Sequence, residues 1–326
     1  MDFFLQLLFT GVGIGAVYAL VALGFVLILR ATNVVNFAQG EFSMVAAYVM
    51  VVFAVDLGWP YWLAFLIAIA GMALLGAVFN LFVYYPLRNR TYLPVLISTI
   101  GASIFLSNTV LALYGPQPQV LPGWLDTPGF QIGPVYLEPL AKPLFPGIKT
   151  ESDGARIRIG ARTPFYFASS SLDSQYLIVI AVTLALVAFQ YWLFEHTLLG
   201  KKLQATSQDK EMAALLGIPV AAMIMITFVY SAVLGGVAGI LVAPILFVSI
   251  QMGSTIALKA FAATIIGGFG DVAGAILGGF AIGIIETFGA AYISVPFKDA
   301  FAFLVLILFL ALRPQGLFGE RVAEKA

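Results

Sequence analysis

The chain has 326 residues, of which 61% are hydrophobic and 10% charged, and its mean hydropathy is +1.02. Soluble domains carry about a quarter charged and about half apolar residues, so this composition indicates a membrane protein. Basic and acidic residues number 16 each and cancel, which leaves no basic face for a nucleic-acid partner. Without cysteine, and with His196 as the single histidine, the chain can form neither disulfides nor a Cys- or His-based metal cluster of its own.

Nine apolar segments follow one another along the sequence. Backbone polar groups must be paired within lipid, and the segments are continuously apolar rather than alternating, so they indicate helices and exclude a membrane barrel. The sequence therefore predicts an all-α fold: a polytopic bundle of roughly eight or nine transmembrane helices with broken or re-entrant parts, in one domain over residues 1–326. The segments are Phe3–Leu29, Glu41–Val55, Tyr61–Tyr84, Leu93–Tyr114, Gln175–Phe194, Val220–Val248, Ile256–Phe269, Val272–Tyr292 and Phe297–Leu312.

The orientation follows from basic residues in short loops, which favour the cytoplasmic side. These residues are Arg88, Arg90, Lys201, Lys202, Lys210, Arg313, Arg321 and Lys325. The first apolar segment lacks a preceding basic residue and is too long for a signal-peptide core, so we expect it to be a retained helix. Nine crossings would place the N-terminus outside and the C-terminus inside. If Ile256–Phe269 is only re-entrant, the count falls to eight.

Residues 115–174 are rich in proline and glycine and too polar to span a membrane. We expect them to form a small extracytoplasmic loop insert. Within it, Ala155–Arg162 alternates as a β-strand does, which favours a hairpin. An ordered coil without a role is the alternative.

A polar break, Asn36–Glu41, separates the first two apolar segments. The next stretch, Phe42–Val55, is too short to cross about 30 Å of hydrocarbon alone, so we expect Glu41 to lie within the membrane. Intramembrane carboxylates are costly and mark anchors or functional sites, and broken helices hold polar substrates in transporters. The break therefore predicts either a buried hydrogen-bond network or a substrate pathway. Its candidate pathway residues are Asn36, Gln39, Glu41 and Ser43.

Two further charges lie near apolar segments. Lys259 comes early in a short segment, and we expect its amine to extend to the outer surface. Glu286 lies inside an apolar run and should face protein or water rather than lipid. Both are candidate pathway residues, whereas Asp271 follows a glycine-rich run and reads as a turn residue.

Small residues and a weak internal similarity bear on packing. Gly11 with Gly15, Gly235 with Gly239, and Gly274 with Gly278 stand four apart, which predicts close helix packing. Gly15–Val26 resembles Gly239–Val248, each followed by a polar break, which favours inverted repeats.

Residues 200–218 form a charged, helix-permissive insert between two apolar segments. Ser207 or Gln208 is expected to open a short helix, with acidic residues in its first turn and Gly217 and Pro219 at its end. Met212, Leu215 and Leu216 fall on one face at helical spacing. The pattern is typical of an interfacial helix or of a docking element for a soluble partner.

The chain has no Gly-x-x-x-x-Gly-Lys-[Ser/Thr] phosphate loop and no evident Ser/His/Asp set. We therefore predict that it is not an enzyme, and that any ATP hydrolysis takes place in another chain.

Several stretches together resemble the permease subunits of bacterial branched-chain amino-acid ABC importers, and the similarity covers nearly the whole chain. They are Gly15–Gly24, Asn36–Met44, Ile97–Gly101, Gly200–Gly217 and Lys259–Gly279. The resemblance implies a multi-pass protein of the bacterial cytoplasmic (inner) membrane, in contact with lipid. It also implies a second homologous permease, two cytoplasmic ATPase subunits that bind ATP and Mg²⁺, and an extracytoplasmic substrate-binding protein.

In that family the piece from 211 to 217 corresponds to the coupling helix, which inserts into a groove of the ATPase. The resemblance implies that docking involves Gln208, Asp209, Glu211, Ala213, Ala214, Leu215, Leu216 and Gly217. Two features depart from the family pattern: Gln39 stands where the family usually has histidine, and the outer insert is longer.

The predicted function is inward transport of branched-chain amino acids by alternating access. Permeases for urea or short-chain amides share the framework and remain an alternative. An ion-coupled secondary transporter is a second alternative, for which only Glu41 and Glu286 could serve as intramembrane carboxylates. An intramembrane enzyme ranks third.

Overall fold

The computed structural model describes residues 2–123, 131–132, 135–136, 164–167, 170–313 and 315–318. The strand expected at Ala155–Arg162 lies outside the described residues, as does most of the outer insert. Two short antiparallel hairpins are described in that region. They pair β1 (Gln131–Ile132) with β2 (Val135–Tyr136), and β3 (Pro164–Phe167) with β4 (Ser170–Asp173).

Helices make up nearly all of the described chain. Seven spans are long and apolar enough to cross a membrane, and α9 and α11, with 17 and 15 residues, are shorter apolar helices. The helical bundle is thus confirmed, and the nine predicted apolar segments each correspond to a helix. The helices are α1 (Asp2–Thr32), α2 (Gln39–Met50) with the π-helix η1 (Val51–Asp56), α3 (Tyr61–Phe79) with η2 (Asn80–Tyr84) and the 3-10 turn η3 (Tyr85–Leu87), α4 (Tyr92–Tyr114), α5 (Ser174–His196), α6 (Leu198–Gln208), α7 (Lys210–Leu215), α8 (Val220–Leu246), α9 (Gln251–Gly267), α10 (Val272–Tyr292) and α11 (Lys298–Leu312).

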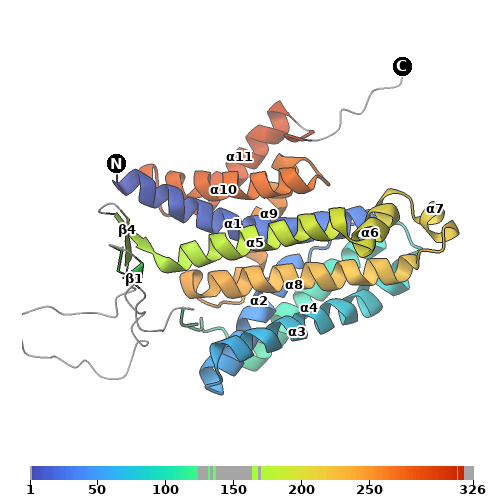
Figure 1. Cartoon of the computed structure of the whole chain (residues 1–326), viewed down its shortest axis with the longest axis horizontal. Helices are drawn as coiled ribbons and strands as arrows, with labels where there is room; N and C mark the ends of the chain where they lie inside the picture. Colours follow the sequence, from blue (N-terminus) through green and yellow to red (C-terminus); the bar gives the residue numbers. More distant parts are fainter. Residues whose placement is uncertain are drawn as a thin grey trace, which may run out of the picture.

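The long helices run side by side, so the bundle has two distinct ends (Figure 1). The β-strands and the start of α1 lie at one end, and α6 and α7 lie at the other. At the first end, the segment after α8 and the segment after α4 pair through Val248 and Gln119. At the second end, Arg30 at the end of α1 donates to the carbonyl of Gly270, and Leu317 donates to Ile266.

The charges differ between the two ends. The α6–α7 end carries Arg30, Arg88, Arg90, Lys201, Lys202, Lys210 and Arg313 among the described residues. At the opposite end, the end of η1 contributes Asp56, and the start of α11 contributes Lys298 and Asp299. By the tendency of basic residues in short loops to stay in the cytoplasm, this asymmetry predicts that the α6–α7 end faces the cytoplasm and the hairpins face outward.

The bundle contains two sets of helices that are arranged alike but run in opposite directions. α1 packs along α10, and α8 packs along α3. After α1 the chain turns back and α2 begins inside the bundle, and after α8 it does the same before α9. Inverted repeats produce this arrangement. The two stretches whose sequence similarity suggested inverted repeats do not occupy equivalent positions in the two sets. Gly15–Val26 lies mid-way along α1, whereas Gly239–Val248 runs past the end of α8.

Glycines permit the closest helix contacts, as their spacing predicted. A Cβ on Gly15 would lie 2.7 Å from the backbone of Phe280, so α1 and α10 could not approach so closely. A Cβ on Gly239 would overlap the carbonyl of Ser43, where α8 meets α2. The core is thus held by backbone proximity, which maximises van der Waals contact where lipid removes most of the hydrophobic driving force.

Candidate functional site

The break between α1 and α2 is stabilised by local hydrogen bonds. Asn33 adopts a positive φ of 61°, which reverses the chain after α1. The Asn36 side-chain oxygen then accepts from the Ala38 backbone N–H at 3.1 Å, and α2 begins at Gln39. The buried side-chain nitrogen of Asn36 has no hydrogen-bond partner among the described residues. This segment is therefore an ordered re-entrant loop rather than a surface connection.

Gln39 joins three helices at the level where α2 starts. Its side-chain nitrogen donates to the Ser231 carbonyl of α8 at 3.1 Å, and its oxygen lies 2.8 Å from the Ser231 hydroxyl. Gly24 of α1 provides the space, because a Cβ there would overlap the Gln39 amide. Ser43, one turn further along α2, donates to the Gly235 carbonyl at 2.8 Å. Both side chains are fully buried, so in this conformation they belong to a packing network.

Glu41 lies in the first turn of α2 and is 3% exposed, so the structure places this carboxylate within the protein at membrane depth. One oxygen accepts from the Ser103 hydroxyl of α4 at 3.0 Å. The other oxygen has no partner in the part of the chain described, and it faces Gly253 of α9, whose Cβ would stand 2.7 Å away. Glu41 therefore lies where α2, α4 and α9 meet.

A second polar cluster lies toward the outer end, around Lys259. Its amine contacts Glu286 of α10 at 2.7 Å and Asp299 of α11 at 2.6 Å. The hydroxyl of Tyr18 in α1 lies 3.2 Å from that amine and donates to the second Glu286 oxygen at 2.9 Å. Lys298 approaches Glu286 at 3.3 Å. The side chains of Lys259 and Glu286 are 4% and 0% exposed, so the expected extension of Lys259 to the surface is wrong: a buried carboxylate holds the amine inside the bundle.

This cluster forms one wall of a cavity of about 210 Å³. The cavity is lined by α1, by the start of α9, and by the ends of α10 and α11 that face outward. Its lining residues are Tyr18, Leu246, Ser249, Gln251, Met252, Thr255, Ile256, Lys259, Glu286, Lys298 and Asp299. The volume is sufficient for a small polar solute, and the walls carry both charge signs.

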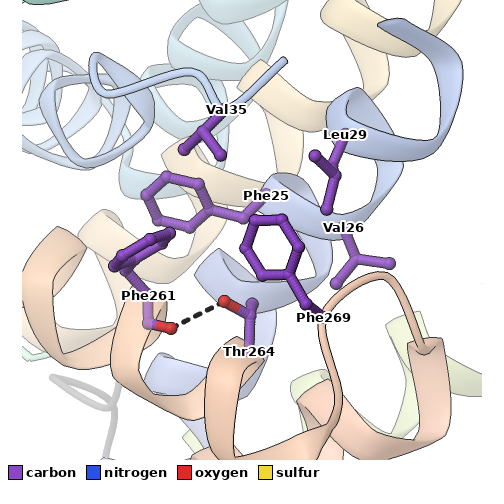
Figure 2. Close-up of a pocket in the computed structure, with 7 residues that line it drawn as sticks. All are labelled: Phe25, Val26, Leu29, Val35, Phe261, Thr264 and Phe269. Carbon is purple, nitrogen blue, oxygen red and sulfur yellow. Dashed lines mark hydrogen bonds between the residues drawn. The ribbon is translucent and has the colours of Figure 1, made fainter. Parts of the chain in front are cut away.

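The opposite, cytoplasmic half of the same helices is closed by aromatic side chains. Figure 2 shows Phe25, Phe261 and Phe269 turned toward one another, with Val35 of the re-entrant loop against them. The ring centroids of Phe25 and Phe261 are 5.8 Å apart, and those of Phe261 and Phe269 are 6.2 Å apart. This second pocket leaves no free volume for a water molecule, so it holds no ligand in this conformation.

The family model described as "branched-chain amino acid transport system / permease component" matches residues 7–310. The chain belongs to this family. The high-affinity branched-chain amino acid transport system permease protein LivH of Escherichia coli (strain K12) is 32% identical over 332 residues, which cover 99% of this chain and 98% of LivH. BraD of Pseudomonas aeruginosa is 32% identical over 336 residues, with the same coverage. The probable LivH of Methanocaldococcus jannaschii is 26% identical over 313 residues, 92% of this chain and 88% of that protein.

In this permease the insert at 200–218 forms parts of two helices rather than one. Gln208 ends α6, and Asp209 is the N-cap of α7, its carboxylate accepting from the backbone N–H groups of Glu211 and Met212 at 2.9 and 3.0 Å. The expected helix start at Ser207 or Gln208 is therefore wrong by one or two residues. The partial burial of Lys210 at the start of α7 lowers the pKa of its amine.

The predicted coupling residues of the permease mostly face solvent. Leu215 and Leu216 are 81% and 76% exposed and Met212 is also exposed, whereas Ala213 is buried beneath them. Gly217 adopts a positive φ of 79°, which ends α7. α7 lies at the end of the bundle opposite the hairpins (Figure 1), and its exposed side chains form an apolar surface there.

Several residues of the two polar clusters were not predicted from the sequence. Tyr18 lies in an uninterrupted apolar run, and Lys298 and Asp299 lie at the start of the last predicted segment, Phe297–Leu312, where nothing in the sequence marked them. Ser103 and Ser231 looked like ordinary small residues of membrane helices. Only the arrangement of α1, α9, α10 and α11 brings the first three beside Lys259.

Proposed function

We propose that the chain is the membrane-embedded subunit of an ATP-driven importer that carries branched-chain amino acids across a bacterial inner membrane into the cytoplasm. The observation that supports this most strongly is the match along nearly the full length to LivH and BraD, both described as branched-chain amino acid permeases. The position of α6 and α7 at the end of the bundle that carries most of the described basic residues supports the same proposal.

Energy for transport comes from outside the chain in this proposal. ATP and Mg²⁺ bind to two separate ATPase subunits, and this chain needs no cofactor of its own. The exposed leucines of α7 dock into an ATPase groove, with Gln208, Asp209, Glu211, Ala214 and Gly217 around them. ATP-driven closure of the ATPase pair then biases two conformations of the helix bundle.

The substrate pathway in this proposal follows the two polar clusters. The outer cavity at Lys259 and Glu286 receives the amino acid from an extracytoplasmic binding protein. The network of Asn36, Gln39, Glu41 and Ser43 lies deeper, beside the aromatic closure of Figure 2. In the inward-facing conformation, separation of Phe25, Phe261 and Phe269 opens the cytoplasmic half.

Co-purification from native membranes tests the importer assignment. A tagged chain extracted in mild detergent should retain an ATPase and a second permease, identified by mass spectrometry. Ala213→Glu places a carboxylate beneath the docking leucines and should release the ATPase while the permease pair survives. Leu74→Ala, on the outward face of α3, is the matched control. Recovery of a lone, stable chain that transports without ATP would support the secondary transporter instead.

A further inference from the structure

The amine of Lys259, in the wall of the outer cavity, has a partner for each of its N–H groups. These partners are the Tyr18 hydroxyl at 3.2 Å, a Glu286 oxygen at 2.7 Å and an Asp299 oxygen at 2.6 Å. An ammonium group carries three donors and no acceptor, so no donor is left for a further partner. A ligand that binds this amine must therefore take the place of one of the three.

The three partners differ in what their departure would cost. Tyr18 and Glu286 are 2% and 0% exposed, and the Tyr18 hydroxyl also donates to the second Glu286 oxygen at 2.9 Å. Displacing either group would leave a buried polar atom without its hydrogen bond, which is costly. The Asp299 side chain is 65% exposed, so water solvates its carboxylate once it leaves the amine. Asp299 is thus the exchangeable partner of Lys259.

The position of Asp299 allows a solute in the cavity to make this exchange. Asp299 lies in the first turn of α11, directly after the exposed connection from α10, and both Asp299 and Lys259 line the outer cavity. A carboxylate inside the cavity can therefore reach the amine that the Asp299 carboxylate now contacts. Charge-assisted contacts between an amine and a carboxylate are stronger than those with a neutral acceptor, so an amide oxygen is a poorer substitute.

The charges of the cluster select what else such a solute must carry. Lys259 and Lys298 oppose Glu286 and Asp299, so the four charges cancel. A solute that brought only a carboxylate would leave one negative charge uncompensated in a largely buried site, which is unfavourable. A solute that also carries an ammonium group keeps the balance, because the released Asp299 carboxylate accepts from that group. The cluster thus suits a zwitterion.

The remaining walls of the cavity suit an aliphatic side chain. Met252 and Ile256, from the first half of α9, are 5% and 1% exposed, and Leu246 at the end of α8 lines the same space. Contact with these side chains removes apolar surface of the solute from water. Urea and short-chain amides offer neither a carboxylate nor a side chain of this kind.

We infer that the outer cavity binds an aliphatic α-amino acid as a zwitterion, with its carboxylate replacing Asp299 on Lys259 and its ammonium group pairing with the released Asp299. This inference rests on the proposed function for the direction of transport, and it deepens that proposal by naming Asp299 as the residue that makes a zwitterion the required ligand.

A single introduced thiol reports on the cavity, because the chain has no cysteine of its own. Thr255→Cys places the thiol on the cavity wall, and Val295→Cys places one in the exposed connection between α10 and α11 as a control. The complex of this chain with its co-purifying subunits, without binding protein or ATP, is treated with a water-soluble maleimide. Labelling of this chain is followed after the subunits are separated on a gel.

The inference predicts that leucine slows labelling of Thr255→Cys several-fold and leaves labelling of Val295→Cys unchanged. Leucinamide, which lacks the carboxylate, should not slow it. Neither should isocaproate, which is leucine without its amine, nor urea. Together these four solutes separate recognition of a zwitterion from simple filling of the cavity.

Asp299→Asn in the Thr255→Cys background tests the exchange itself. The substitution removes the acceptor for the ligand's ammonium group and leaves the cluster with one positive charge in excess. Isocaproate should then slow labelling of Thr255→Cys, and leucine should lose most of its effect. A purely structural role of Asp299 would weaken all solutes alike and would not reverse this preference.

Three results would overturn the inference. They are equal protection by leucine and leucinamide, no protection by leucine even at its solubility limit, and an unchanged ligand preference in Asp299→Asn. Uptake assays on the unlabelled Thr255→Cys complex keep the two proposals separate. ATP-driven leucine uptake without protection would refute the cavity site alone, whereas protection without ATP-driven uptake would retain the site and refute the proposed function.

Discussion

Lys259→Met tests whether the outer polar cluster depends on its ion pair. Lys259 and Glu286 are both buried and 2.7 Å apart, so removal of the amine leaves a buried carboxylate with weaker compensation. Loss of one partner of a buried pair costs about 3–5 kcal/mol. Because Tyr18 and Lys298 still contact Glu286, at 2.9 and 3.3 Å, we expect the lower end of that range, about 3 kcal/mol.

Two companion variants give this prediction its control. Asp299→Asn removes the other carboxylate beside Lys259, but the Asp299 side chain is 65% exposed, so its loss should cost below about 1 kcal/mol. Lys259→Met combined with Glu286→Leu removes both buried charges, and the double variant should be more stable than Lys259→Met alone.

The free energy of unfolding, measured by denaturant titration in detergent micelles, reports all three variants. Wild-type stability of Lys259→Met would refute the reasoning, because a buried carboxylate that has lost its closest cation must cost free energy. A double variant less stable than Lys259→Met would show that packing rather than charge holds the cluster together.

Three further predictions address the other sites. Asp209→Ala removes the cap of α7 and should destabilise that helix by about 1 kcal/mol, lowering ATP-driven uptake while Asp209→Asn retains most of it. Gly239→Leu forces α8 away from the Ser43 carbonyl and should abolish folded protein, measured as the monodisperse fraction after extraction, whereas Gly71→Leu on the open face of α3 should be tolerated. Glu41→Gln keeps an acceptor for Ser103 and should preserve expression better than Glu41→Leu, and equal yields would argue that the carboxylate makes no structural contact.

The sequence predicted the membrane helices well because lipid imposes one strong constraint, that apolar runs be helical. It placed Glu41 inside the membrane from the shortness of the segment after it, and the structure buries that residue. It misplaced the start of the cytoplasmic helix, because α6 and α7 are separated by the single non-helical residue Asp209, which also reads as a first-turn acid.

The contacts within the polar clusters were beyond prediction for a different reason, although most of the residues were singled out. A helix that is apolar on all sides shows almost no periodic alternation of polar and apolar residues. The sequence therefore could not show which neighbouring helices the face of α9 that carries Lys259 contacts. An ion pair between α9 and α10 depends on how two helices cross, and Asp299 joins it from a third helix. Gln39 was singled out as a departure from the family, but its contacts with Ser231 required the position of α8.

ATP-dependent uptake of labelled leucine tests the central claim most directly. The assay uses proteoliposomes that contain this chain with its co-purifying subunits and binding protein, and urea and a short-chain amide serve as comparison substrates. The account predicts leucine uptake that requires ATP and is lost in the Ala213→Glu complex. ATP-dependent uptake of urea or the amide alone would contradict the substrate, and leucine uptake by an intact complex that is indifferent to ATP would contradict the importer mechanism itself.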